Sequence, residues 1–466
     1  MTFQRDLAWQ TLDLKYRSSI SYQYARYGLT LNFDSIPQDV VHQAKRCVLD
    51  AFACAIGAYE APGLPICEAV VRELGGTEEA TVIGSGLRTT ASNAALVNSF
   101  LVRFLDFNDL GGGGHNTDAI PAIVAIAERE KKGGSDFLTS VVISYELGER
   151  VRESFMSNEA GVANDIRGGL TMPPTLGRLM GLNEDQIANA IGTCACASLP
   201  LHVLDCDLEE NSMRKNLRFG WVACDAILSC LLAKKGFTGP IRVVEGEGGW
   251  REVLLPHMNL DRLVDFSGWR ILKVRHKFIP ANGSSQGHLQ ATLALVKEHD
   301  LKPEDIAAVR IIASRREAKH TTTASKKYPR NAESADHSSF YQNAHAIKER
   351  SFGVDAMNPD RFTDPVILDL IEKITVEGDP DMPYSCLQGI SEITTKDGRT
   401  FRKHVVHPHG TGTDPLTDKE LEEKFREMAI TYMGEKQIKQ ILDAVWGLEK
   451  LDNMGSLMKL TVFPSR

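Results

Sequence analysis

The sequence predicts a mainly α-helical protein with a smaller α+β domain, arranged as a large helical domain built from both chain ends and an α+β lid. Apolar residues recur at helical spacing over roughly the first 270 residues, β-branched segments follow, and helical spacing returns near the C-terminus. We expect the helical domain to comprise residues 1–272 and 408–466, and the lid residues 273–407.

The expected helices of the first part follow one another without intervening strands, which is typical of a helical array. The segment 35–60 begins with Ser35 and Pro37, residue types that favour a helix start. Further helices are expected over residues 89–107, 121–134, 134–154, 183–198, 219–236, 417–430 and 435–451.

Several later segments favour strands because their residues alternate or are β-branched. They are residues 268–281, 306–315, 373–382, 389–407 and 457–464. Within 389–407, Asp397 and Gly398 separate two strand-like runs, which is a strong signal for a hairpin.

Composition narrows the class of function. The chain has 466 residues, 24% of them charged, and a net charge of −8. This acidic balance argues against a nucleic-acid partner, and an anionic ligand would need a locally positive pocket. We expect no membrane association and no signal peptide, because apolar runs are short and the N-terminus is polar. The nine scattered cysteines, none in a CxxC pair, suit buried thiols in a reducing cytoplasm.

The stretch 103–118 places charged residues around four consecutive glycines. It holds Arg103, Asp106, Asp109 and His115. Such glycines allow close approach of the backbone to a ligand, although a helix cap followed by a surface turn explains the same residues.

Two lysines occur in unusual surroundings. Lys215 lies among apolar residues before a helix, and a buried lysine would need a carboxylate partner, which a substrate can supply. Lys277 precedes a polar turn, after which His288 begins a helix whose free amides suit a carboxylate. A solvated helix start and an ordinary strand–turn–helix connection are the alternatives.

A dense polar cluster precedes another expected helix. It contains Asp336, His337, Ser338 and Tyr341. A serine nucleophile of the hydrolase type needs a GxSxG elbow, which this chain lacks, so Ser338 is better interpreted as a cap or ligand donor.

Three histidines near the end of the predicted lid raise the question of a metal. On a strand His407 and His409 share a face, whereas His404 points to the other face. The chain also lacks an HExxH motif, and we therefore expect no metal site.

Five motifs in order resemble the MmgE/PrpD family, which includes 2-methylcitrate dehydratases, cis-aconitate decarboxylases and iminodisuccinate epimerases. They are NAALVNSFLVRFLDFND, LAKKGFTGPIRVVEGEGGW, HKFIPANGSSQGHLQA, ADHSSFYQNAHAI and DGRTFRKHVVHPHGTGTDPLTDKELEEKF. The resemblance covers nearly the whole chain. It implies the fold expected above, a homodimer, no cofactor, and a small anionic carboxylate as substrate.

The resemblance also implies roles for individual residues. His115 would be the acid or base, with Asp106 orienting it or raising its basicity. Lys215 would supply positive charge to an enolate-like intermediate, and Tyr341 would protonate or position a departing hydroxyl. Lys277 would bind a substrate carboxylate, together with further binding residues Arg103, Asp109, His288, His337 and Ser338.

The leading hypothesis is a cofactor-independent dehydratase of a small di- or tricarboxylate such as 2-methylcitrate. The alternatives are an epimerase, a decarboxylase, and a metabolite-binding paralogue without activity. They stay open because Leu110, Asn116, Leu170 and Asn282 replace residues common in the family (Thr or Ser, Pro, His, and in some decarboxylases His).

Overall fold

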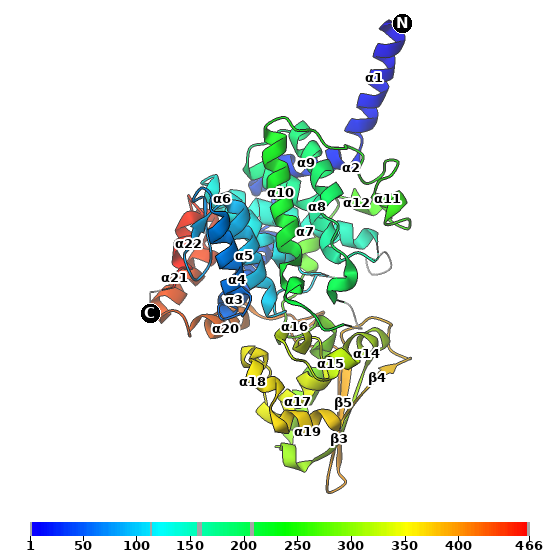
Figure 1. The fold of residues 1–466 in the computed structure, drawn as a ribbon, viewed down its shortest axis with the longest axis vertical. Coiled ribbons are helices and arrows are strands. Elements are labelled where there is room, and N and C mark those ends of the chain that lie inside the picture. The colour runs from blue at the N-terminus through cyan, green and yellow to red at the C-terminus, as the bar shows by residue number, and fades with distance from the viewer. Residues whose placement is uncertain (1, 112–113, 156–160, 206–208, 464–466) are drawn as a thin grey trace.

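The computed structural model describes residues 2–111, 114–155, 161–205 and 209–463. Gly112, Gly113 and Cys206 therefore lie outside the described residues. Figure 1 shows a large helical body and a smaller part that contains the main sheet, with α16 (Ala332–Ala335) where the two meet. The predicted fold class is confirmed.

Helices of the N-terminal region form most of the body and pack against one another in pairs such as α3–α5, α5–α10 and α8–α9. The longer ones are α1 (Thr2–Arg17), α2 (Ile20–Thr30), α3 (Gln38–Gly57), α4 (Leu64–Leu74), α5 (Ala91–Phe104), α6 (Ile120–Arg129), α7 (Gly134–Ser154), α8 (Gly168–Leu179), α9 (Glu184–Ala197) and α10 (Arg218–Lys234). Two short helices, α11 (Trp250–Val253) and α12 (Leu260–Leu263), and the two-stranded β1 (Ala80–Thr81) and β2 (Arg88–Thr89) complete this region.

The smaller part is built on a four-stranded sheet in the order β4-β3-β5-β6. β3 (Ile306–Ser314) runs parallel to β4 (Ile374–Asp379) and antiparallel to β5 (Gly389–Thr395), which pairs with β6 (Thr400–Val405). The hairpin expected at Asp397–Gly398 joins β5 to β6, and Gly398 has a φ of +87°.

Helices cover this sheet. α13 packs on β5, β6 and α17, and α17 packs on α19. The helices of this part are α13 (Gln286–Glu298), α14 (Arg315–Thr321), α15 (Ala324–Lys327), α16, α17 (Ser339–Glu349), α18 (Pro359–Phe362) and α19 (Pro365–Glu372).

Two strand predictions are wrong. Residues 268–281 contain a 3-10 turn (Arg270–Lys273) and irregular backbone, because Arg275 exchanges backbone hydrogen bonds with Leu110 of the body and not with a sheet. Residues 457–460 belong to the helix α22 (Gly455–Leu460), whose Leu457 and Met458 are buried in the main core, and residue 464 lies outside the described residues.

The C-terminal helices return to the helical body. α20 (Asp418–Ala429) and α21 (Glu435–Trp446) contact α3, and α22 contacts α6. This packing accords with a helical domain made from both chain ends, while the domain boundaries at 272/273 and 407/408 stay predictions.

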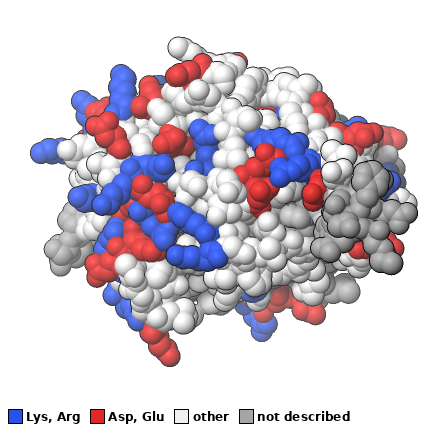
Figure 2. Space-filling model, turned by 90° about the horizontal axis from the view of Figure 1, so that it is seen from above, with Lys and Arg blue, Asp and Glu red and all other residues white. Residues whose placement is uncertain are grey.

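One helical segment, Met213–Lys234, is long and apolar enough to cross a membrane by length and composition alone. Of that window 61% is buried inside the fold, and its helix α10 packs against α5, α8 and α9. A core helix of a globular protein has the same properties. On the face seen in Figure 2, basic and acidic side chains lie beside one another around uncharged surface, without a continuous basic patch.

Candidate active site

Asp106 lies at the centre of a buried ionic cluster. Its backbone has a φ of +45°, a strained value for a residue with a side chain, and it ends α5. The Nζ of Lys277 donates hydrogen bonds to Oδ1 of Asp106 at 2.8 Å and to its carbonyl oxygen at 2.5 Å. Arg103, one turn earlier on α5, donates to the same Oδ1. Burial alone would raise the pKa of Asp106, but the charges of Arg103, Lys277 and Lys215 hold it well below its usual value.

His115 faces this carboxylate with one ring nitrogen. Its Nδ1 donates to the carbonyl oxygen of Asp109 at 2.7 Å, which places the proton of the neutral ring on Nδ1. Its Nε2 lies 3.4 Å from Oδ1 of Asp106. Burial, followed by the charges of Arg103 and Lys277, lowers the pKa of His115 well below its usual value. The ring is therefore neutral near pH 7, with the lone pair of Nε2 directed at the cluster.

Gly111, four residues before His115, lies in a close contact that leaves no room for a side chain. The amide of Gly111 donates to the carbonyl oxygen of Gly114 at 3.1 Å, and a Cβ at Gly111 would collide with Oε1 of Glu149. Asn116 donates to that oxygen at 2.6 Å, and Arg167 donates to the carbonyl oxygen of His115 at 2.6 Å. These contacts hold the backbone of His115 from both sides.

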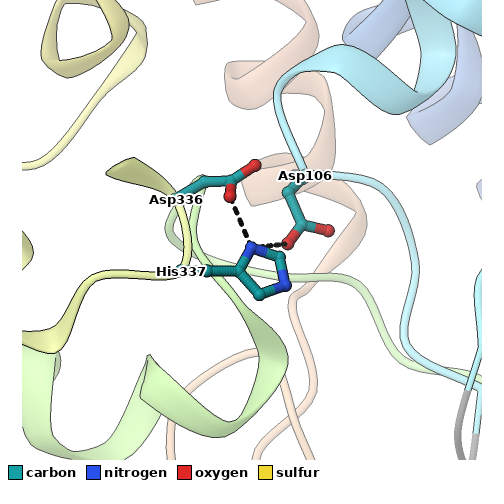
Figure 3. Close-up of side chains that lie close together, drawn as sticks. All are labelled: Asp106, Asp336 and His337. Carbon is teal, nitrogen blue, oxygen red and sulfur yellow. Dashed lines mark hydrogen bonds and ion pairs between the residues drawn. The ribbon is translucent and has the colours of Figure 1, made fainter. Parts of the chain in front are cut away.

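Residues from the smaller part complete the cluster. Figure 3 shows Asp336 and His337, which follow α16, pointing toward Asp106. Nδ1 of His337 lies 2.5 Å from Oδ1 of Asp336 and 3.9 Å from Oδ2 of Asp106. Lys215, which is fully buried, donates to Oδ2 of Asp336 at 2.5 Å. Burial and the charge of Lys215 lower the pKa of His337 to about 4.

The cluster carries a positive charge when its imidazoles are neutral. Three cations surround two carboxylates, so the formal net charge of the cluster is +1. The cations are Arg103, Lys215 and Lys277, and the carboxylates are Asp106 and Asp336. A locally positive site in an acidic protein suits an anionic ligand.

The ligand atoms of Asp106, Asp336 and His337 lie within 4.8 Å of one another, close enough to contact a metal ion. Arg103 and Lys277 already donate to Oδ1 of Asp106, and Lys215 donates to Oδ2 of Asp336. Ammonium and guanidinium groups therefore fit this donor set better than a divalent cation does.

Two predicted site residues have structural contacts instead of contacts with the cluster. The hydroxyl of Tyr341 donates to the carbonyl oxygen of Ala356 at 2.6 Å, and its side chain is buried among aromatic rings. Ser338 caps α17 by accepting a hydrogen bond from the amide of Tyr341 at 3.0 Å.

His288 and Asp109 also lie apart from Asp106. His288 lies inside the smaller part, 3.2 Å from Oγ of Ser339 and 3.5 Å from Glu317. The carboxylate of Asp109 accepts hydrogen bonds from Thr117 and Tyr145, and burial raises its pKa to about 7. Asp109 reaches the cluster only through the carbonyl oxygen that receives Nδ1 of His115.

The structure adds His320 and Asn282 to the surroundings of the cluster. The ring of His320 lies edge-on to the ring of His337, with centroids 5.2 Å apart. The backbone amide of Asn282 donates to the carbonyl oxygen of Asp336 at 2.8 Å. No motif in the sequence marks His320. Leu170 is fully buried in α8.

Comparisons with known proteins show the family of the chain. The family model described as the MmgE/PrpD N-terminal domain matches residues 22–263, and the MmgE/PrpD C-terminal domain matches residues 279–448. The chain is 24% identical to a cis-aconitate decarboxylase of Aspergillus terreus, over 98% of both chains. It is 23% identical to the human cis-aconitate decarboxylase, over 96% of this chain and 94% of the relative. It is 21% identical to the cis-aconitate decarboxylase-like protein oryM of Aspergillus oryzae, over 95% of this chain and 97% of the relative.

Proposed function

Because this chain belongs to the MmgE/PrpD family, we propose that it is a cofactor-independent lyase that removes water from a small di- or tricarboxylate such as 2-methylcitrate. One observation carries the proposal: the unprotonated Nε2 of His115 lies beside Asp106 among three buried cations. A base and positive charge at one place are what proton removal next to a carboxylate needs.

In the proposed reaction, Nε2 of His115 takes the proton from the carbon next to a substrate carboxylate. Asp106, 3.4 Å away, stabilises the imidazolium that forms. Lys277 binds the carboxylate and stabilises its enolate-like form, a charge-assisted contact that strengthens as negative charge develops. The ammonium of Lys215 donates a proton to the departing hydroxyl, which leaves as water while the carbon–carbon double bond forms.

The names of the relatives favour loss of carbon dioxide as the second candidate. In a decarboxylation the electron pair stays on carbon, and a protonated group must then donate a proton to it. Since the pKa of His115 lies well below its usual value, this residue rests as a base and not as an acid, which favours proton removal by His115 as the first step.

Turnover assays with 2-methylcitrate, citrate, cis-aconitate and iminodisuccinate test the proposal. Dehydration of 2-methylcitrate or citrate produces absorbance of a conjugated alkene, and decarboxylation releases carbon dioxide. Exchange of a carbon-bound proton with D2O at unchanged composition would indicate an epimerase instead. Binding of all four without turnover would indicate a binding paralogue and contradict the proposal.

A further inference from the structure

Lys424 of α20 extends from the C-terminal helices to the back of the ionic cluster. Its side chain is 5% exposed, although lysine is rarely buried without partners. The Nζ atom donates to Oδ1 of Asp50 at 2.7 Å, to the carbonyl oxygen of Phe107 at 2.7 Å and to the carbonyl oxygen of Lys277 at 3.2 Å. These three acceptors use all three protons of the ammonium group.

The two carbonyl groups belong to segments that carry the proposed chemistry. Phe107 directly follows Asp106, and Lys277 is the residue whose own ammonium contacts Asp106 at 2.8 Å. The segments are 170 residues apart in sequence, and Lys424 is bonded to both. Its Nζ also lies 3.5 Å from the centre of the Phe107 ring. The ammonium of Lys424 thus links the backbone of Phe107 to the backbone of Lys277.

Asp50 of α3 holds Lys424 in turn. Burial alone would raise the pKa of Asp50, but the charges of Lys424 and His276 lower it below its usual value. The pair is therefore charged inside the core, where loss of one partner is costly.

We propose that Lys424 is a positioning residue that sets the spacing of Lys277 and Asp106 by holding the backbone of both segments. Its catalytic effect rests on the proposed function, whereas its effect on the geometry of the cluster does not. Misplacement of reacting groups by about 1 Å costs on the order of 100-fold in rate, so a residue of the C-terminal helices would influence activity through the geometry of the cluster.

Two variants separate positioning from stability. Lys424→Met leaves the carboxylate of Asp50 buried without its lysine partner and is expected to lower the Tm. Asp50→Asn/Lys424→Met removes that charge together with the lysine and is expected to recover part of the Tm. The two carbonyl groups stay without their ammonium in both variants.

Lys45 provides a matched control. It is buried on α3, and it also links this helix to the C-terminal region, donating to the carbonyl oxygen of Trp446 at 2.7 Å and contacting Glu449 at 2.6 Å. Its bonds lie outside the cluster. Lys45→Met is expected to lower the Tm but to keep kcat/KM within about 2-fold of the wild type, the range of a substitution that leaves the reacting groups in place.

Turnover of the polycarboxylate is the first measurement. Well below the Tm of each protein, kcat/KM is expected to fall about 10- to 100-fold in both Lys424 variants. Wild-type kcat/KM in Asp50→Asn/Lys424→Met would overturn the proposal, and so would an equal loss in Lys45→Met.

The second measurement does not need turnover, so it separates failure of this proposal from failure of the proposed lyase activity. The imidazole of His115 is titrated by NMR of histidine-labelled protein and assigned by comparison with His115→Gln. If Lys277 moves away in Asp50→Asn/Lys424→Met, the midpoint of His115 is expected to rise, since the charge of Lys277 lowers it in the wild type. An unchanged midpoint would overturn the proposal even if no substrate is found.

Discussion

At the scale of single residues, the two ring nitrogens of His115 make different contacts. Nδ1 is committed to the carbonyl oxygen of Asp109, whereas Nε2 faces Asp106. The family resemblance predicted that Asp106 orients the ring or raises its basicity. The ring donates a hydrogen bond to the backbone of Asp109, which fixes its orientation, and the carboxylate of Asp106 lies close enough to stabilise the charged ring.

Replacement of His115 by Ala is therefore expected to lower kcat at least ~100-fold, the lower end for a general acid–base group. The Tm should change little, because the ring makes one hydrogen bond and is 17% exposed. His404→Ala is the control, since His404 is exposed and contacts Gln388. Full activity of His115→Ala would remove this residue from the mechanism.

Replacement of Lys277 by Ala tests the binding role. The loss of a buried charged contact to a carboxylate is expected to weaken substrate binding at least ~10-fold, measured as Kd by calorimetry with a polycarboxylate. Unchanged affinity would show that Lys277 does not contact the substrate.

The pH profile of kcat/KM tests the protonation state of the base. Since burial and the nearby cations lower the pKa of His115, the free base persists below pH 6.5, the usual value of histidine. The acidic limb of kcat/KM should therefore lie below pH 6.5. Arg103→Gln removes one of those cations and is expected to move the acidic limb to higher pH. An acidic limb at or above pH 6.5 in the wild type would contradict His115 as the base.

At the scale of elements, sequence patterns predicted the parts whose structure depends on local periodicity. The helices α3, α5, α7 and α20 follow from apolar spacing and end residues, and the β5–β6 hairpin follows from Asp397–Gly398. Residues 268–281 were misassigned because their backbone partners, Leu110 and Lys424, lie far away in sequence. Alternation of residues cannot reveal such partners.

The same limit applies to the site. Residue types and the family resemblance led to Asp106, His115, Lys215, Lys277 and His337, which the structure brings together. They did not show that the hydroxyl of Tyr341 bonds Ala356, because that contact depends on how α17 packs. The catalytic role of Tyr341 stays a prediction.

The close contact of Gly111 with Glu149 gives a prediction about stability. Gly111→Ala introduces a Cβ against Glu149, whose carboxylate is held by Asn116 and Arg152. Either Gly111 or the Glu149 side chain must shift, so we expect a loss of about 1–3 kcal/mol in the free energy of unfolding, as for other overpacked sites, and a lower kcat. Gly353→Ala is the matched control because open space surrounds that position. Equal stability of the two variants would show that Gly111 is not tightly packed.

At the scale of the whole molecule, the expected homodimer needs an apolar surface that the isolated chain leaves exposed. Trp221 and Leu228 lie seven residues apart on α10 and are 50% and 55% exposed. Residues at this spacing share one face of a helix. Exposed apolar patches of this kind commonly mark contacts with another protein. We therefore expect this face of α10 to contact a second copy.

Trp221→Glu/Leu228→Glu tests that expectation by mass measurement in solution. Wild-type protein should have the mass of two chains, and the variant the mass of one, because burying two carboxylates in an apolar contact is costly. Val253→Glu, at a position that is 65% exposed on α11, is the control and should keep the wild-type mass. Since α10 directly follows the turn that holds Lys215, a dimer through this face would also brace that lysine, and the monomeric variant should lose activity as well as mass. A variant that stays dimeric would place the contact on another surface.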